Sequence, residues 1–387
     1  MNFQEKWRKL LLPLRYGGSG VDFKKLDPAR SPFLQDRDRI IYSSSFRRLA
    51  RKTQVHPLVR NDHIHTRLSH SLEVSSVGRS LGAMAGYFLR RRDELPEYAA
   101  PEFPGQILEA ACLAHDIGNP PFGHAGEFAI RDWFGDPANH TYVNALEETH
   151  QSDFRCFDGN AQGFRVVNVV ENNRDQGGFR LTYPTLASMV KYPWDSWQSR
   201  TRSGKCKFNY YQAEAGIFEE VFCALGLKTR RGDFARHPLS LLAEAADDTC
   251  YRIVDMEDAR ELDIITLADI LKVVEPLAPS LRLDPQRLED MGSDRERAGC
   301  HRPRDREPVR DLRRAVRAHH AAGVRRSAHG YGAGGRPGLY GQGQRDLQRA
   351  HPQEQSQDGA GDRVLQRLQA PAGYLHPGLP SPHLRSR

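Results

Sequence analysis

Three stretches of the chain carry apolar residues at the spacing of an amphipathic α-helix. The first stretch ends in three arginines at positions 90–92, and its apolar positions recur every three to five residues: Leu68, Leu72, Val77, Leu81, Met84 and Phe88. Cations in the last turn of a helix stabilise it, because they interact favourably with the negative end of the helix dipole. The spacing therefore predicts one long helix that runs to this basic end.

Two further helices are predicted downstream. Residues 107–114 are rich in Ala and Leu, and this helix must stop before Pro120 and Pro121, because proline lacks the N–H that a helix interior requires. The third helix spans about 238–262, and Pro238 fits its first turn. Its inward-facing positions are predicted to be Leu239, Leu242, Ala246, Cys250, and Ile253 or Val254.

The region between these helices is richer in Gly and aromatic residues and favours a short β-hairpin at about 179–190. No internal repeat is visible. We therefore expect an all-α fold, mainly α with minor β. The expected organisation is an N-terminal segment at 1–60, a helical core at 61–275, a linker at 276–290 and a tail at 291–387 rich in Arg, Gly and Pro.

A chain of 387 residues is long enough for two or three sub-structures. No run approaches the roughly 18 to 20 apolar residues that cross a bilayer, and the apolar block 10–12 is too short for a secretory signal. We expect a cytoplasmic protein without a membrane partner. The six cysteines lie far apart and form no C-x-x-C pair, so we expect buried or incidental thiols and neither a zinc knuckle nor a disulfide framework.

The net charge of +7 resides in the tail. Residues 291–387 hold 18 Arg, no Lys and 9 acidic residues, and the 56 basic and 49 acidic residues of the whole chain therefore leave 38 against 40 in the first 290 positions. The body of the protein has no general attraction for phosphate polymers.

The tail contains 8 Leu, 4 Val and no Ile or Phe, so it cannot bury enough apolar area to offset the entropy of ordering its backbone. We expect no packed domain there. Three explanations remain open: a disordered Arg-rich tail that binds nucleic acid, a solvated linker, or a reading-frame shift in a GC-rich gene. The abrupt change of composition near residue 290 favours the frame shift.

Two imidazoles and two carboxylates fall on the three predicted helices. His70 lies on the first, His115 and Asp116 lie at the end of the second, and Asp247 lies on the third. This mixed nitrogen and oxygen set suits Mn²⁺, Fe²⁺, Mg²⁺ or Zn²⁺. A single histidine in a helix is more often structural, so the surrounding motifs decide: TRLSHSLEV at 66–74, AHDIGNPPFGH at 114–124 and ADD at 246–248.

With these motifs the chain resembles the HD-domain phosphohydrolases, and among them the deoxynucleoside triphosphate triphosphohydrolases of the dGTPase type. The resemblance covers about residues 30–262 and includes FRRLARKTQV (46–55), HDIGNPPFGHAGE (115–127), FDGNAQGFR (157–165), MVKYP (189–193) and AADDTCYRIVDMEDA (245–259). It implies that the core at 61–275 is a metal-dependent HD phosphohydrolase. The implied reaction is hydrolysis of a deoxynucleoside triphosphate, above all dGTP, to deoxynucleoside and tripolyphosphate.

The same resemblance implies the residues of the site. The metal ligands would be His70, His115, Asp116 and Asp247. His124 would be the catalytic histidine, and Glu127 would orient it. A separation of three residues lets Glu127 reach the His124 ring if a helical turn begins there.

Further residues match the family's substrate contacts. Gln54, Tyr251 and Asp255 would hold the sugar, and Arg67, Lys191 and Tyr192 would contact the phosphates. Asp247, Tyr251 and Asp255 also recur at i, i+4 and i+8, which places them on one helix face. Each set also has a structural alternative. The helix face with Asp247, Tyr251 and Asp255 would be capped and salt-bridged with Tyr251 in the core, and Arg67 and Lys191 would be solvated cations. Asn160 and Gln162 belong to a family motif without an assigned role.

The resemblance also implies a divalent metal, Mn²⁺ or Mg²⁺ with Fe²⁺ or Zn²⁺ as alternatives, and a homo-oligomer, hexameric in the family, with single-stranded DNA as a further partner. No Walker-type loop is present, which argues against a P-loop hydrolase. Two other functions remain open. One is a different HD phosphohydrolase, such as a nucleoside monophosphatase or a cyclic-nucleotide phosphodiesterase. The other is a non-catalytic HD protein that binds nucleic acid.

Overall fold

The computed structural model describes the N-terminal two thirds of the chain. The described residues are 2–16, 18, 27, 30–58, 61–172, 177–203, 206–266, 269–270 and 273. The predicted linker at 276–290 and the predicted tail at 291–387 lie outside the described residues.

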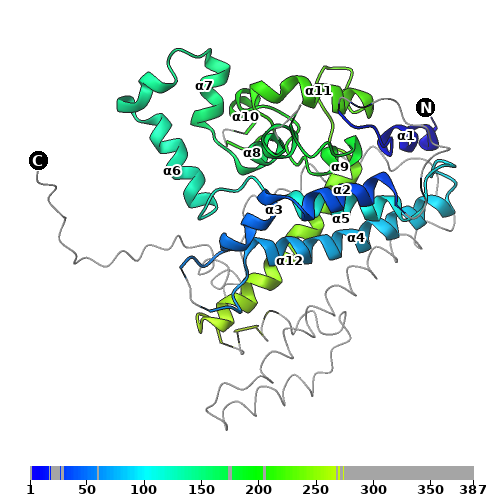
Figure 1. The fold of residues 1–387 in the computed structure, drawn as a ribbon, viewed down its shortest axis with the longest axis horizontal. Helices are drawn as coiled ribbons and strands as arrows, with labels where there is room; N and C mark the ends of the chain where they lie inside the picture. The colour runs from blue at the N-terminus through cyan, green and yellow to red at the C-terminus, as the bar shows by residue number, and fades with distance from the viewer. Residues whose placement is uncertain are drawn as a thin grey trace, which may run out of the picture.

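The described part of the chain is built of helices and their connections (Figure 1). The α-helices are α1 (Phe3–Leu10), α2 (Pro32–Ile41), α3 (Ser44–Arg48), α4 (Arg67–Arg91), α5 (Phe103–Ala114), α6 (His124–Gly135), α7 (Glu148–Arg155), α8 (Gly159–Arg165), α9 (Tyr183–Ser188), α10 (Ser196–Ser203), α11 (Ala215–Ala224) and α12 (Pro238–Glu261). Shorter helical turns are η2 (Leu49–Arg51), η3 (Pro137–Tyr142), η4 (Val166–Val170) and η5 (Gln212–Glu214). The predicted all-α fold is confirmed.

The β content within the described residues is limited to isolated bridges, which join Arg15 to Thr182, Thr53 to Thr66, Asp195 to Tyr210 and Lys228 to Phe234. The predicted hairpin at about 179–190 is wrong. Helix α9 occupies that stretch, and Pro184 lies in its first turn, where a missing N–H leaves no helical bond unmade. The aromatic residues that suggested a strand are instead buried in the core: Phe179 and Tyr183.

Helices α4 and α5 pack closely side by side. Three glycines on α4 follow one another at four-residue spacing and face α5: Gly78, Gly82 and Gly86. A Cβ added at Gly78 would lie 2.6 Å from Cys112 Sγ, and one at Gly82 would lie 2.7 Å from Gly105 Cα. The absence of side chains at these positions lets the two helix backbones approach.

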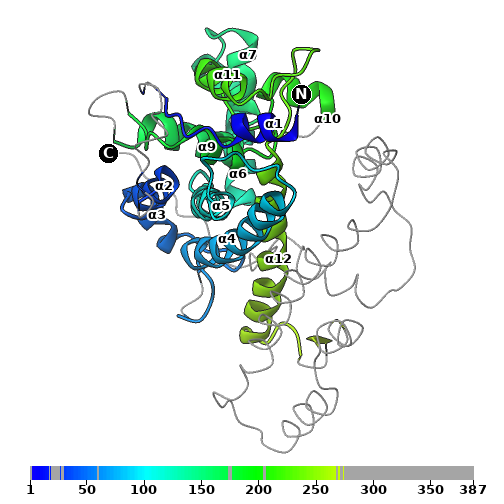
Figure 2. The same ribbon diagram turned by 90° about the vertical axis from the view of Figure 1, so that its right-hand side faces the viewer.

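Helix α12 crosses this pair, and its C-terminal end extends beyond them (Figure 2). Ala246 and Cys250 of α12 share an apolar cluster with Val77 and Leu81 of α4 and with Cys112 of α5. The predicted spans of α4 and α12 are confirmed, and α5 ends where predicted but begins at Phe103, four residues earlier than predicted. The predicted inward positions of α12 are buried, with Leu242 half-buried: Leu239, Ala246, Cys250, Ile253 and Val254.

A larger apolar core joins α5 to α8, α9 and α11. The loop after α5 passes directly against α8, because a Cβ at Gly118 would lie 2.5 Å from Gly163 Cα. Helices α6 and α7 project from this body (Figure 1). None of the helices in the described ranges has the length and apolar character needed to cross a membrane.

A disulfide joins Cys156, at the end of α7, to Cys206, which lies 50 residues further along the chain. The expectation that the cysteines are unpaired thiols is therefore wrong for this pair. The tertiary fold brings the two residues together, and their spacing in the sequence carries no sign of it. Of the others, Cys112 and Cys250 are buried thiols, Cys223 is an exposed thiol, and Cys300 lies outside the described residues.

Candidate active site

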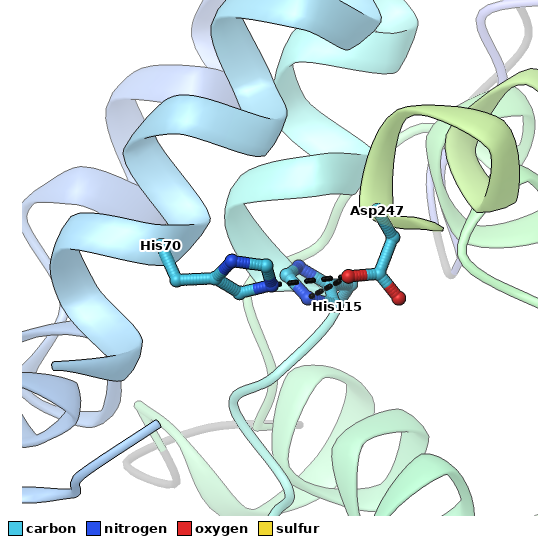
Figure 3. Close-up of side chains that lie close together, drawn as sticks. All are labelled: His70, His115 and Asp247. Carbon is cyan, nitrogen blue, oxygen red and sulfur yellow. Dashed lines mark hydrogen bonds and ion pairs between the residues drawn. The ribbon is translucent and has the colours of Figure 1, made fainter. Parts of the chain in front are cut away.

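Three residues from three helices converge on one point, and we call them the ligand cluster: His70, His115 and Asp247 (Figure 3). His70 Nε2 lies 3.0 Å from Asp247 Oδ1, and His115 Nε2 lies 3.6 Å from the same oxygen. One donor atom from each residue lies within 4.8 Å of the others. Within the described ranges this is the one such group of His, Cys, Asp and Glu.

The packed helices place each member of the cluster. His70 lies in the first turn of α4, which is fixed by reciprocal hydrogen bonds between Thr66 and Ser69. His115 directly follows α5, and Asp247 lies near the middle of α12. Because α12 packs on both α4 and α5, the three side chains meet where the helices cross.

Hydrogen bonding outside the cluster orients the His115 ring. His115 Nδ1 lies 2.6 Å from the Cys112 carbonyl oxygen, so this nitrogen carries the proton and donates it. The lone pair of Nε2 then faces the cluster. Burial opposes ionisation of Asp247, but His115 and His70 hold the pKa of its carboxyl below the usual value. Two imidazole nitrogens and a carboxylate oxygen are a donor set that fits a divalent cation.

Asp116, the fourth predicted ligand, lies at the edge of this cluster. Its Oδ1 is 3.6 Å from His115 Nε2 and accepts a bond of 2.5 Å from Asn119 Nδ2. Its Oδ2 accepts a bond of 2.7 Å from Arg67 Nη1. Burial works against the charge, but Arg67 and His115 hold the pKa of Asp116 well below its usual value. The predicted phosphate contact Arg67 is therefore bonded to a predicted ligand.

His124 and Glu127 form a hydrogen-bonded pair on α6. His124 is the first residue of this helix, and its Nδ1 lies 2.9 Å from Glu127 Oε2. The chain enters the helix through Phe122 and Gly123, which both have positive φ angles, of 65° and 54°. The His124 side chain is 76% exposed, whereas that of Glu127 is 4% exposed. The geometry that the three-residue spacing predicted is present, and the catalytic role remains a prediction.

Glu127 is held by further donors. Its Oε1 accepts a bond of 2.8 Å from the Gly159 N–H, and its Oε2 lies 3.4 Å from both Arg131 Nη2 and Lys207 Nζ. Burial raises the pKa of Glu127, but the hydrogen bond from His124, the charge of Lys207 and the Gly159 N–H outweigh it and lower the pKa to about 2. The carboxylate is therefore ionised throughout the neutral range.

Sequence reasoning missed these partners of Glu127. Gly159 lies in the FDGNAQGFR motif, and a cation near a buried carboxylate was to be expected on physical grounds. Arg131 follows Glu127 by four residues on α6, a spacing that the sequence alone could have shown. Nothing in the local sequence marks Lys207, because it reaches Glu127 through the tertiary fold.

The structure places two of the three predicted sugar contacts on one helix and the third on a separate segment. Tyr251 and Asp255 lie one turn apart on α12 and are joined by a side-chain hydrogen bond, whereas Gln54 follows η2. Burial is the main cause that raises the pKa of Asp255 to about 7, with the charges of Asp258 and Asp247 adding to it. Within the described chain, Gln54 Oε1 and Asp255 Oδ1 are buried without a hydrogen-bond partner. Buried acceptors of this kind are what a ligand hydroxyl would satisfy.

The loop that carries Lys191 and Tyr192 is fixed by Asn209. The Asn209 side-chain oxygen accepts both backbone N–H groups, at 3.1 Å and 2.7 Å. Lys191 Nζ pairs with Glu244 Oε1 at 2.8 Å, and Glu244 lies on α12 one turn before Asp247. Lys191 is therefore paired with the helix that supplies the third member of the ligand cluster.

Comparison with known proteins identifies a family domain and several relatives. The HD domain model matches residues 67–178. The chain is 48% identical over 266 residues to a deoxyguanosinetriphosphate triphosphohydrolase-like protein of Pseudomonas aeruginosa. The aligned region covers 68% of this chain and 59% of that relative. A protein of the same name from Synechocystis sp. is 45% identical over 287 residues, covering 70% and 64%. The deoxyguanosinetriphosphate triphosphohydrolase of Klebsiella pneumoniae is 37% identical over 266 residues, covering 60% and 51%. The chain thus spans roughly three fifths of the length of these relatives.

Proposed function

This chain carries an HD domain and is related to the deoxyguanosinetriphosphate triphosphohydrolase-like proteins, and we propose that it is a metal-dependent hydrolase of a deoxynucleoside triphosphate. The proposed products are the deoxynucleoside and tripolyphosphate, with dGTP as the preferred substrate. The observation that carries this proposal is the convergence of His70, His115 and Asp247 from three helices.

The ligand cluster would hold the metal, with Asp116 beside it as the fourth ligand. The proposed ion is Mn²⁺ or Mg²⁺. Carboxylate donors suit both ions, and proteins commonly bind Mg²⁺ together with the phosphates of a substrate. When bound, such a cation polarises a phosphoryl group and lowers the pKa of a water molecule.

His124 would supply the proton that the leaving group needs. Its Nδ1 is engaged by Glu127, which leaves Nε2 as the nitrogen that can face a substrate. In its protonated form this nitrogen donates to the departing 5′-oxygen of the nucleoside, while the Glu127 carboxylate stabilises the charged ring. The exposure of the His124 side chain leaves it accessible to a ligand.

The remaining predicted contacts would recognise the two ends of the substrate. A triphosphate carries about four negative charges, and phosphoryl transfer depends mainly on positioning and on electrostatic stabilisation of that charge. Lys191 and Arg67 supply cations for this purpose. The orphaned acceptors of Gln54 and Asp255 would take hydrogen bonds from the deoxyribose.

Hydrolysis assays with the full chain test this proposal. The protein is stripped of metal and then supplied with Mn²⁺ or Mg²⁺ and each of the four deoxynucleoside triphosphates, and the products are separated by ion-exchange chromatography. We expect metal-dependent release of tripolyphosphate, fastest from dGTP. Release of orthophosphate alone would instead assign a different HD phosphohydrolase. Metal binding without turnover of any of the four would favour a non-catalytic HD protein.

A further inference from the structure

Lys207 lies between two buried carboxylates. Its Nζ is 3.4 Å from Glu127 Oε2 and 3.2 Å from Asp158 Oδ2. Glu127 is 3% exposed and Asp158 is fully buried. Glu127 in turn accepts the hydrogen bond from His124, so Lys207 is one residue removed from the proposed proton donor.

Two carboxylates this close in a buried site cannot both remain ionised without a cation between them. Burial is the main cause that raises the pKa of Asp158, and the charge of Glu127 raises it further. The charge of Lys207 opposes both effects.

In the described part of the chain, no other cation that faces one of these carboxylates is paired with both. Glu127 also meets His124, Arg131 and the Gly159 N–H, whereas Asp158 meets the backbone N–H and side-chain amide of Asn160. The Arg131 guanidinium donates mainly to two carbonyl oxygens, those of Phe157 at 2.6 Å and Cys206 at 3.2 Å. Among the described residues, Lys207 is therefore the cation paired with both carboxylates.

The backbone of Lys207 is fixed on both sides. Its N–H donates to Ser199 Oγ at 2.9 Å, and its carbonyl oxygen accepts from Ser199 Oγ at 2.8 Å and from Trp194 Nε1 at 2.7 Å. The preceding residue, Cys206, is joined by the disulfide to Cys156, two residues before Asp158. The backbone that carries the ammonium group is thus held in a defined place.

We propose that Lys207 is a positioning residue, which keeps Glu127 ionised and directed at His124 Nδ1 so that His124 Nε2 faces the substrate. This inference rests on the proposed function of the His124 and Glu127 pair. Without the charge of Lys207, the repulsion between Glu127 and Asp158 is no longer offset by a cation paired with both. Glu127 then no longer orients the His124 ring or stabilises its charged form.

Kinetics of matched variants test the inference. Lys207→Met removes the charge, Lys207→Arg keeps it, and Lys228→Met removes a surface lysine that pairs with Glu219 at 2.5 Å, as a control. In the full chain with Mg²⁺, Lys207→Met lowers kcat roughly 10- to 100-fold with KM changed less than about threefold, the scale on which partners of site residues act. The acid limb of its kcat profile moves to higher pH. Lys207→Arg recovers most of kcat, and Lys228→Met equals the unmodified protein.

An effect on KM instead of kcat overturns the inference. A tenfold rise in KM at unchanged kcat makes Lys207 a phosphate contact, and kinetics equal to the unmodified protein give it no role. The double variant Lys207→Met/Asp158→Asn separates positioning from a general loss of folding, because removal of the second carboxylate relieves the repulsion. We expect it to regain about tenfold in kcat over Lys207→Met; no gain contradicts the mechanism.

A measurement without turnover separates this inference from the proposed function. In the Mg²⁺-loaded chain with ¹⁵N-labelled histidine, the His124 signals are assigned by their loss in His124→Gln. We expect a proton on Nδ1 in the unmodified protein and in Lys207→Arg, and an altered protonation pattern in Lys207→Met. Identical spectra of all three contradict the inference even if dGTP is hydrolysed. If the protein hydrolyses no deoxynucleoside triphosphate, the proposed function fails and this spectrum still decides the role of Lys207.

Discussion

The ligand cluster and the His124 and Glu127 pair are held in different ways. The cluster lies where α4, α5 and α12 cross, and His70 is fully buried. His124 begins a helix that projects from the body, and its ring is fixed by one hydrogen bond to Glu127 (Figure 1). Helix packing therefore positions the proposed metal donors, whereas a short chain of polar contacts positions the proposed proton donor. Damage to the first should abolish function outright, and damage to the second should reduce it in steps.

The largest effect is expected from loss of a donor in the ligand cluster. Asp247→Ala or His115→Ala leaves two of the three converging donors with Asp116 beside them, which makes a weak site of poor geometry. We expect loss of bound metal and of turnover together, measured by elemental analysis and by dGTP hydrolysis. The control is Asp263→Ala, which removes a surface carboxylate paired with Arg260. Metal content and turnover near those of the unmodified protein would falsify the ligand assignment.

A smaller effect is expected from the proton donor. His124→Ala removes a side chain whose hydrogen bond goes to Glu127 and not to the ligand cluster, so metal content should stay unchanged. Turnover should fall by roughly two to four orders of magnitude, the usual worth of a positioned acid or base. The same change at His140, whose ring contacts the Gly135 carbonyl oxygen, serves as the control. Full turnover of His124→Ala at saturating substrate would leave His124 as an ordinary residue of the loop.

A variant of Tyr251 tests whether α12 also distinguishes deoxyribose from ribose. Its hydroxyl is hydrogen-bonded to Asp255, one turn along α12. If this pair occupies the space that a 2′-hydroxyl would need, Tyr251→Ala should reduce the preference for dGTP over GTP by about tenfold, as for loss of one shape-selective contact. The ratio of kcat/KM for the two nucleotides measures it. Equal hydrolysis of both by the unmodified protein would rule the idea out.

The smallest effect is expected on the stability of the packing between α4 and α12. His65 Nδ1 lies 2.6 Å from Asp258 Oδ1 and joins the start of α4 to the end of α12. Burial opposes its charge, but Asp258 and Glu73 raise the pKa of His65 to about 9 from 6.5. The folded pKa is the higher one, so the stabilisation is complete below pH 6.5 and is lost as the pH rises through 9.

Urea unfolding at several pH values measures this contribution. Between pH 6.5 and pH 9.5 the unmodified protein should lose about 1 to 3 kcal/mol more stability than His65→Gln, since each unit of pKa shift corresponds to roughly 1.4 kcal/mol. Parallel stability curves for the two proteins would show that the ion pair does not couple α4 to α12.

In both regions the sequence could predict the features that depend on local contacts. The apolar periodicity of α4, α5 and α12 reports burial directly, so their spans and the helix positions of His70, His115 and Asp247 followed from it. The spacing of His124 and Glu127 likewise anticipated a helical turn, and α6 begins at His124. In these cases the contacts that matter are local in the chain.

Contacts between distant segments could not be predicted in this way. Lys207 reaches Glu127 across 80 residues, and the disulfide spans 50. The expected hairpin failed because buried aromatic residues suit a helix as well as a strand, whereas Pro184 fits the first turn of a helix and cannot donate to a strand ladder. Asp116 matched its motif as a ligand, but only the fold shows that Arg67 and Asn119 hold its oxygens.

The most direct test of the proposed function follows the oxygen of the attacking water. The full chain hydrolyses dGTP with Mg²⁺ in H₂¹⁸O, and mass spectrometry locates the label. Attack at the α-phosphorus, with His124 protonating the 5′-oxygen, predicts one ¹⁸O in tripolyphosphate and none in deoxyguanosine. Label in orthophosphate, or in the nucleoside, would contradict a triphosphohydrolase built on the ligand cluster.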